Sequence, residues 1–167
     1  GPAMGRPKSA SFRTLDLVGL DTFLHVARNV RESVQNPTEK EEFAVPEFLE
    51  KMAAERWLGD KTGQGFYKKV AGPKGKEYHS LDWRTLEYRP QQKAVFASLE
   101  AAKQVSGTAA KLKTLIQAKD RAGEFAWSVL KRSLLYTAAR IPEIADDIVN
   151  VDQAMRWGFN WELGPFE

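Results

Sequence analysis

Apolar residues recur at three- and four-residue steps in the first third of the chain, which is the spacing of one face of an α-helix. The face comprises Leu20, Phe23, Leu24, Ala27 and Val34. Asn36-Pro37 ends the pattern, because the residue before a proline is disfavoured in the helical region. We therefore predict a helix from Asp16 to about Val34, preceded by an extended loop over the first dozen residues.

A second apolar stripe follows Pro46, a residue suited to the first position of a helix. The stripe comprises Phe48, Leu49, Met52, Ala53 and Trp57. Gly59 comes directly after it and predicts a left-handed C-cap that closes this helix.

The second half of the chain predicts further helices of the same kind. The expected segments are a brief helix capped by Ser98 and ending near Val105, a helix from Ala109 to Ala118, a long helix from Arg121 to Ala139, a short one from Pro142 to Ile148, and one capped by Asn150 and ended by Gly158. Ile141-Pro142 should end the long helix, since proline cannot donate the helical hydrogen bond.

Extended runs are short. Phe66 to Val70 and Lys76 to Leu81 flank "AGPKG" and predict a small hairpin near residues 66–81. The segment that follows, "DWRTLEYRPQQKAVFAS", has no clear period, and we interpret it as an irregular linker. The predicted fold class is all-α with one minor β-hairpin.

The stretch "WLGDKTGQGFY", residues 57–67, has the glycines, lysine and threonine of a phosphate-binding loop. Such a loop follows a strand and opens a helix, with a Gly-Lys-Ser/Thr end. Here the predicted order is reversed, because an amphipathic helix precedes the glycines and an aromatic run follows them. We therefore interpret the loop as a hinge in which Gly59, Gly63 and Gly65 supply positive φ angles.

Composition excludes only a few classes of function. The chain has 167 residues, 25 basic and 22 acidic side chains and a net charge of +3. The two signs are intermixed, so we expect no nucleic-acid partner. There is no cysteine, which excludes disulfides and thiolate chemistry. We find no long uncharged apolar run and expect no membrane span.

Candidate acid–base groups are few. His25 is expected to be a partly buried helix residue, and His79 a solvated residue of the hairpin. Asp146 and Asp147 are adjacent, so they suit a helix cap better than a catalytic pair. We therefore predict no catalytic, cofactor-binding or metal-binding residue in this chain.

Several motifs resemble the C-terminal helical domain of 3-hydroxyacyl-CoA dehydrogenases, in particular the long bacterial and archaeal forms. They are residues 1–30 with "DLVGLD", "WLGDKTGQGFYKK", "LDWRTLEYRP" and residues 123–167. The resemblance implies a 6-phosphogluconate-dehydrogenase C-terminal-like helical fold. It also implies a parent enzyme of fatty-acid β-oxidation that is cytoplasmic and oxidises L-3-hydroxyacyl-CoA with NAD.

In that family a Rossmann domain binds NAD and carries the catalytic histidine and glutamate. No segment here resembles it, so the resemblance implies a fragment that is inactive alone. The expected partners are the missing Rossmann domain, the acyl-CoA substrate and a second copy in a homo-oligomer.

The resemblance also suggests an internal duplication, with "LGPFE" in the place of "SASFR". It assigns residues 1–70 to the end of a first helical repeat, 71–97 to the hairpin and linker, and 98–167 to the start of a second repeat. The loop "GPAMGRPK" resembles the family's acyl-pocket lining, so Met4, Arg6 and Lys8 are the candidate substrate contacts. A terminus without fixed structure is the competing expectation for this loop. A free-standing helical module that binds another protein is the alternative function.

Overall fold

The computed structural model describes residues 1–73 and 75–167. The chain divides into two compact units, one formed by Ser11–Gln92 and the other by Gly1–Ala10 together with Lys93–Glu167. This division rests on spatial contact and does not test the assignment of residues 1–70, 71–97 and 98–167 to repeats, which stays a prediction.

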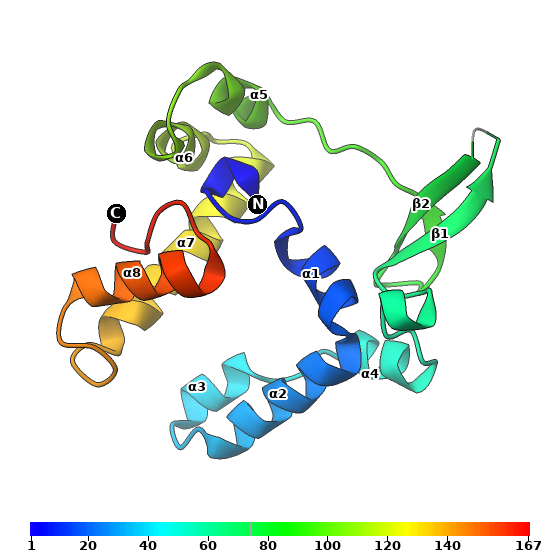
Figure 1. Cartoon of the computed structure of the whole chain (residues 1–167), viewed down its shortest axis with the longest axis horizontal. Coiled ribbons are helices and arrows are strands. Elements are labelled where there is room, and N and C mark those ends of the chain that lie inside the picture. Colours follow the sequence, from blue (N-terminus) through cyan, green and yellow to red (C-terminus); the bar gives the residue numbers. More distant parts are fainter. Residues whose placement is uncertain (74) are drawn as a thin grey trace. The chain divides into compact units, whose positions relative to one another are not determined.

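The unit of residues 11–92 combines helices with a small sheet (Figure 1). Its helices are α1 (Ala10–Val18), α2 (Leu20–Ser33), α3 (Pro37–Glu42) and α4 (Glu47–Ala54), with a 3-10 turn η2 (Asp60–Thr62). Its strands are β1 (Tyr67–Gly72), β2 (Gly75–Leu81) and β3 (Tyr88–Pro90), paired antiparallel in that order. The core is Leu20, Leu24, Leu49, Met52 and Phe66.

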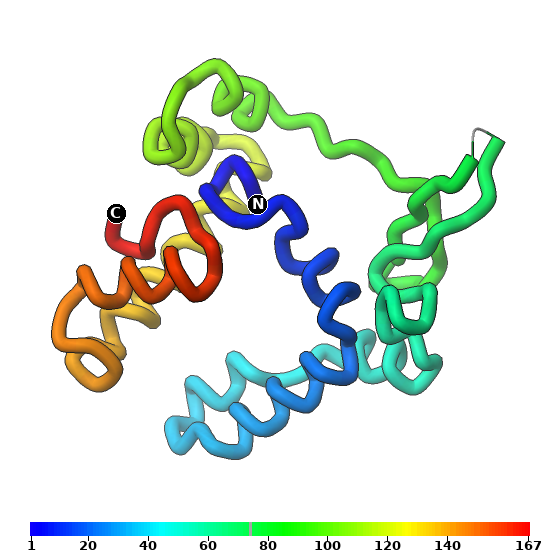
Figure 2. The backbone as a smooth tube through the Cα atoms, viewed as in Figure 1, coloured from blue at the N-terminus to red at the C-terminus, as the bar shows by residue number. Residues whose placement is uncertain are grey.

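The other unit begins with a 3-10 turn, η1 (Pro2–Met4), and continues with α5 (Ala97–Gln104), α6 (Thr108–Ile116), α7 (Arg121–Ala139) and α8 (Ile148–Phe159). η1 packs against α5 and α6, as the tube in Figure 2 also shows. The buried apolar side chains here are small for the most part: Ala102, Leu115, Ala126 and Val151.

The all-α prediction with a minor hairpin is confirmed, and a third strand is added. β3 lies inside the segment interpreted as irregular linker, where Leu81 pairs with Tyr88 and His79 with Pro90. The strand is only three residues long and ends in proline, so it leaves no alternating pattern in the sequence. Lys74, within the predicted turn "AGPKG", lies outside the described residues.

Several helix boundaries differ from the prediction. The N-terminal loop is helical from Ala10, and the helix predicted over 16–34 is broken between α1 and α2 at Gly19. α4 begins at Glu47 with Pro46 as its N-cap, and it ends at Ala54, well before Gly59. Arg56 takes the left-handed conformation there, with φ 58°.

The caps of the second half were also misplaced. α5 begins at Ala97, and Ser98 is buried instead of capping it. The segment after Pro142 forms turns in place of the predicted helix. α8 is capped by Asp147, whose carboxylate accepts from the Asn150 amide at 2.8 Å, and it continues past Gly158 to Phe159. α6 and α7 lie where the sequence places them.

Candidate functional site

The N-terminal loop that carries the predicted substrate contacts is held in place by the C-terminal segment. The Glu162 amide donates to the Gly5 carbonyl at 2.8 Å, and the Thr108 hydroxyl donates to the Glu162 carboxylate. Gly5 is buried and left-handed, with φ 64°, and a Cβ there would overlap the Thr108 methyl group. The N-terminal loop is therefore held at Gly5 by its contacts with Glu162 and Thr108.

Of the three predicted substrate contacts, Arg6 has a defined contact with another side chain. Its guanidinium lies 4.1 Å from the centroid of the Trp161 ring, a cation–π contact. Burial lowers the pKa of Arg6, because a low-dielectric environment disfavours the charged form. Met4 is also half-buried, whereas Lys8 is exposed. The structure therefore brings Met4 and Arg6 into one packed loop and leaves Lys8 at the surface.

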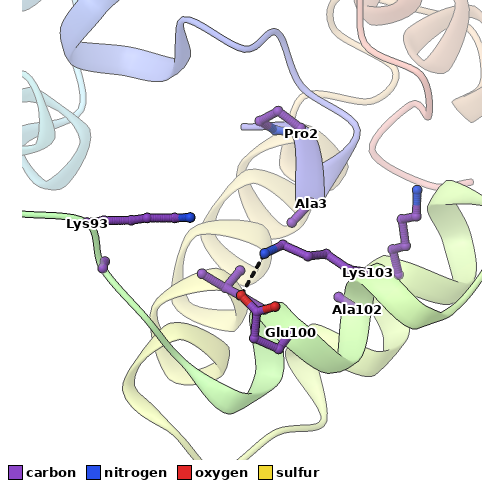
Figure 3. A pocket seen from close by; sticks show the side chains of 9 residues that line it. Pro2, Ala3, Lys93, Glu100, Ala102 and Lys103 are labelled. Atoms are coloured by element: carbon purple, nitrogen blue, oxygen red, sulfur yellow. Dashed lines mark hydrogen bonds and ion pairs between the residues drawn. The ribbon is translucent and has the colours of Figure 1, made fainter.

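A cavity of about 430 Å³ lies beside this loop (Figure 3). Pro2 and Ala3 of the loop line it, whereas Met4, Arg6 and Lys8 do not. The other lining residues are Lys93, Ala94, Leu99, Glu100, Ala102, Lys103 and Lys111. The sequence analysis missed all of these residues, because lysines and alanines on short amphipathic helices carry no motif.

Charge around this cavity is unbalanced. Lys103 pairs with Glu100 at 2.6 Å. The pKa of Glu100 is lowered, chiefly by Lys103 and to a smaller degree by Lys93. Three lysines therefore face one carboxylate along an otherwise apolar wall.

The other unit has an apolar cavity of about 540 Å³. Two aromatic contacts form its walls: Phe12 lies 4.8 Å from Phe66 and Phe48 lies 5.9 Å from Trp83, measured between ring centroids. Trp83 is 57% exposed and Phe12 54% exposed. The remaining lining residues are Pro46, Tyr67, Ser80 and Leu81. Such a surface suits hydrocarbon far better than a charged ligand.

The glycine loop is a turn between a helix and a strand, as the sequence predicts. Five of its backbone amides have partners: Gly59 and Gln64 bond to each other in both directions, and Thr62, Gly63 and Gly65 donate to carbonyls of the same stretch. Lys61 pairs with Asp21 at 2.5 Å. A phosphate cradle needs a run of free amides, and the amides of all three glycines of this loop are already engaged.

Asp16 explains the glycine that the sequence analysis misread. Its carboxylate is buried and accepts from the Phe66 amide at 2.8 Å and the Tyr67 amide at 2.9 Å. Gly59 and Gly63 have positive φ, as expected, but Gly65 does not. A Cβ at Gly65 would overlap the Asp16 carboxylate and lie 2.6 Å from the Gly59 Cα, so Gly65 is required for close approach.

The histidines have no catalytic surroundings in the part of the chain that the structure describes. His25 is exposed on α2, which corrects the expectation of partial burial, because it lies outside the helix face that carries Leu20 and Leu24. His79 lies in the hairpin as expected, but it is half-buried on β2 and not fully solvated. Across residues 1–73 and 75–167 no cluster of three potential metal ligands is present, and no helix is long and apolar enough to cross a membrane.

Comparison with known proteins relates part of the chain to one protein family. Residues 3–69 match the family model described as 3-hydroxyacyl-CoA dehydrogenase, C-terminal domain. Residues 3–69 are thus similar to the C-terminal domain of 3-hydroxyacyl-CoA dehydrogenases. The resemblance drawn from the motifs is thereby confirmed.

The relatives that the chain matches are much longer than the chain itself. A probable 3-hydroxyacyl-CoA dehydrogenase of Bacillus subtilis is 55% identical over 167 residues, which is all of this chain and 20% of the relative. One of Deinococcus radiodurans is 45% identical over 76 residues, which is 46% of the chain and 21% of the relative. A putative fatty acid oxidation complex trifunctional enzyme of Rickettsia felis is 24% identical over 98% of the chain and 21% of the relative. The chain thus spans about one fifth of these relatives. No solved structure matches it significantly.

Proposed function

We propose that this chain is the substrate-pocket and oligomerisation part of an NAD-dependent L-3-hydroxyacyl-CoA dehydrogenase of fatty-acid β-oxidation. The observation that carries the proposal is the 55% identity along the whole chain to the Bacillus subtilis protein named a probable 3-hydroxyacyl-CoA dehydrogenase. The name of the Rickettsia relative, which includes fatty acid oxidation, supports the same pathway.

In this proposal the chain supplies part of the lining of the substrate pocket. The NAD site and the proton acceptor lie on another domain of the enzyme. Neither imidazole forms a hydrogen bond or ion pair with a carboxylate among the described residues. A general base in such a reaction needs an orienting partner within hydrogen-bond reach. The geometry therefore supports the proposal that this chain contributes to substrate binding, that another domain carries the catalytic groups, and that the chain is inactive alone.

The predicted substrate contacts remain Met4, Arg6 and Lys8. Arg6 supports this assignment because its guanidinium is stacked on Trp161 without a carboxylate partner in the described residues. A cation held in this way can meet an anionic group of a coenzyme A thioester. The aromatic cavity of the other unit is a surface on which an acyl chain would be removed from water.

Exposed aromatic residues support the oligomerisation part of the proposal. Trp157 of α8 is 79% exposed, and Phe125 of α7 is 68% exposed. Both helices expose further large apolar side chains, and an apolar surface of this kind is typical of protein–protein contacts. We therefore expect α7 and α8 to be covered by a second copy or by the rest of the enzyme.

The test is turnover by the longer polypeptide that joins these residues to an NAD-binding domain. We expect it to reduce NAD with 3-hydroxyacyl-CoA. In that polypeptide Arg6→Ala should raise KM for the thioester by about tenfold with kcat little changed, since a binding contact worth roughly 1.4 kcal/mol is lost. Lys119→Ala, at an exposed position, is the matched control. Absence of NAD-linked turnover in the longer polypeptide would overturn the proposal.

A further inference from the structure

The cavity beside the N-terminal loop combines an apolar floor with a cationic rim. Pro2, Ala3, Leu99 and Ala102 provide carbon surface, and Ala102 is only 2% exposed. The lysines reach this space from separate segments: Lys93 from the linker before α5, Lys103 from α5 and Lys111 from α6. Figure 3 shows Lys93 and Lys103 extending toward the space next to Pro2 and Ala3. The apolar part of an amphipathic ligand would therefore contact the floor of this cavity, and an anionic part would contact the lysines of its rim.

Lys111 is the least compensated of these charges. Its side chain is half-buried, and no carboxylate pairs with it within the described ranges 1–73 and 75–167. Glu100 is already paired with Lys103. Removing an ammonium group from water without an anion beside it is unfavourable, so an anion that enters the cavity would gain from meeting Lys111.

We propose that this cavity binds an amphipathic anion, an aliphatic chain that ends in a carboxylate or a phosphate. The apolar floor would take the chain, and Lys111 with Lys93 would hold the charged end. An ammonium group is a compact point charge with three rotatable donors, so lysines accept either anion, in contrast to the fork of an arginine. The volume of about 430 Å³ falls in the range of small-molecule sites.

This site goes beyond the proposed function, because it requires neither NAD nor a thioester. None of its lining residues is among Met4, Arg6 and Lys8. If no ligand binds in this cavity, the dehydrogenase proposal is unaffected. If the longer polypeptide has no dehydrogenase activity, the proposal of this binding site is unaffected.

The experiment titrates the 167-residue chain with octanoate, octyl phosphate, octanol, inorganic phosphate and coenzyme A, followed by amide chemical shifts. We expect octanoate and octyl phosphate to shift the resonances of Ala3, Leu99 and Ala102. Octanol and inorganic phosphate should each bind at least about tenfold more weakly, because each lacks one half of the ligand. The tighter of the two amphiphiles identifies carboxylate or phosphate as the source of the charge.

Matched variants separate charge from folding. Lys111→Gln removes the charge, keeps a polar side chain that is one atom shorter, and should weaken octanoate binding by about fivefold, the effect of roughly 1 kcal/mol. Lys119→Gln removes one charge at an exposed position outside the cavity and should leave binding unchanged. Equal binding of octanol and octanoate, equal binding by Lys111→Gln and the unaltered chain, coenzyme A binding as tightly as octyl phosphate, or no shift with any ligand would each overturn the proposal.

Discussion

At the residue scale, one buried carboxylate organises the end of the glycine loop. Asp16 is only 3% exposed, and burial raises its pKa although the amides of Phe66 and Tyr67 donate to it. A raised carboxyl pKa means that its protonated form is favoured in the folded state. The part of the stability that comes from protonating Asp16 is therefore fully present below about pH 3.8 and is lost as the pH rises through the folded pKa. The hydrogen bonds from the Phe66 and Tyr67 amides to its carboxylate are a separate contribution that stays at neutral pH.

Replacing Asp16 should loosen the loop at neutral pH. Asp16→Ala leaves two amides without an acceptor, and we expect a loss of about 3 kcal/mol in the free energy of unfolding. Asp16→Asn keeps one acceptor and should lose less. Hydrogen exchange at the Phe66 and Tyr67 amides measures the effect locally, with Asp146→Asn as an exposed control. Unchanged protection of both amides in Asp16→Ala would contradict the role given to this carboxylate.

Two glycines of the same loop should respond differently to alanine. Gly63 has φ 74° with open space around it, so Gly63→Ala should cost about 1 kcal/mol of backbone strain. Gly65→Ala forces a methyl group into Asp16 and should cost more, about 2 kcal/mol or above. Urea unfolding of both variants compares them directly. The reverse order would show that conformation outweighs close approach at this turn.

At the element scale, β3 is attached to the loop by a phenol. The Tyr88 hydroxyl donates to the Gly65 carbonyl, and the Tyr88 ring lies 5.6 Å from that of Trp57. Burial raises the pKa of Tyr88 to about 12. The sheet edge is therefore held by a group that must stay protonated.

Alkaline titration should expose this dependence. Because the folded pKa lies above the ordinary value of 10, the stability from Tyr88 is fully present below pH 10 and is lost as the pH rises toward about 12. Ultraviolet titration should show Tyr88 ionising last or together with loss of the sheet. Tyr88→Phe should remove this phase; a variant that keeps it would place the late ionisation on another tyrosine.

Asp120 joins α5 to α7 in the other unit. It caps α7 by accepting from Ala122 and Gly123, and it also accepts from the amide and hydroxyl of Ser98. These bonds, the Gly123 amide first, lower the pKa of Asp120. A single side chain thus serves as both a helix cap and a tie between helices.

Acid should weaken this joint. With a lowered pKa, the stability from Asp120 is present above about pH 3.8 and is lost as the pH falls through the folded pKa. Asp120→Ala should lower the thermal midpoint at neutral pH and flatten the acid dependence, since the cap of α7 and the bonds to Ser98 are both lost. Ser98→Ala breaks only the tie and should have a smaller effect. Identical midpoints in Asp120→Ala and the unaltered chain would contradict the double role.

At the scale of the whole molecule, periodicity alone predicted the long elements. α6 and α7 follow from their apolar spacing, and the family resemblance follows from two ordered motifs. Three of the errors share one physical cause: they depend on contacts between residues distant in the sequence. Gly65 is explained by Asp16, Ser98 by Asp120, and β3 by its pairing with β2.

The candidate sites were less predictable than the fold for the same reason. Met4 and Arg6 came from resemblance, and their substrate role stays a prediction. The lysine-rimmed cavity arises only when the linker, α5, α6 and the N-terminal turn meet. No spacing along the chain records that meeting, since Lys93, Lys103 and Lys111 each look like ordinary surface residues.

The central claim is that the chain supplies binding surface while the redox cofactor and the base belong to another domain. The most direct measurement incubates the purified 167-residue chain with NAD and 3-hydroxybutyryl-CoA and follows NADH formation. We predict no NADH above the rate without protein, under conditions in which the longer polypeptide turns over. Steady NADH formation by the chain alone, abolished by a substitution of His25 or His79, would contradict the account.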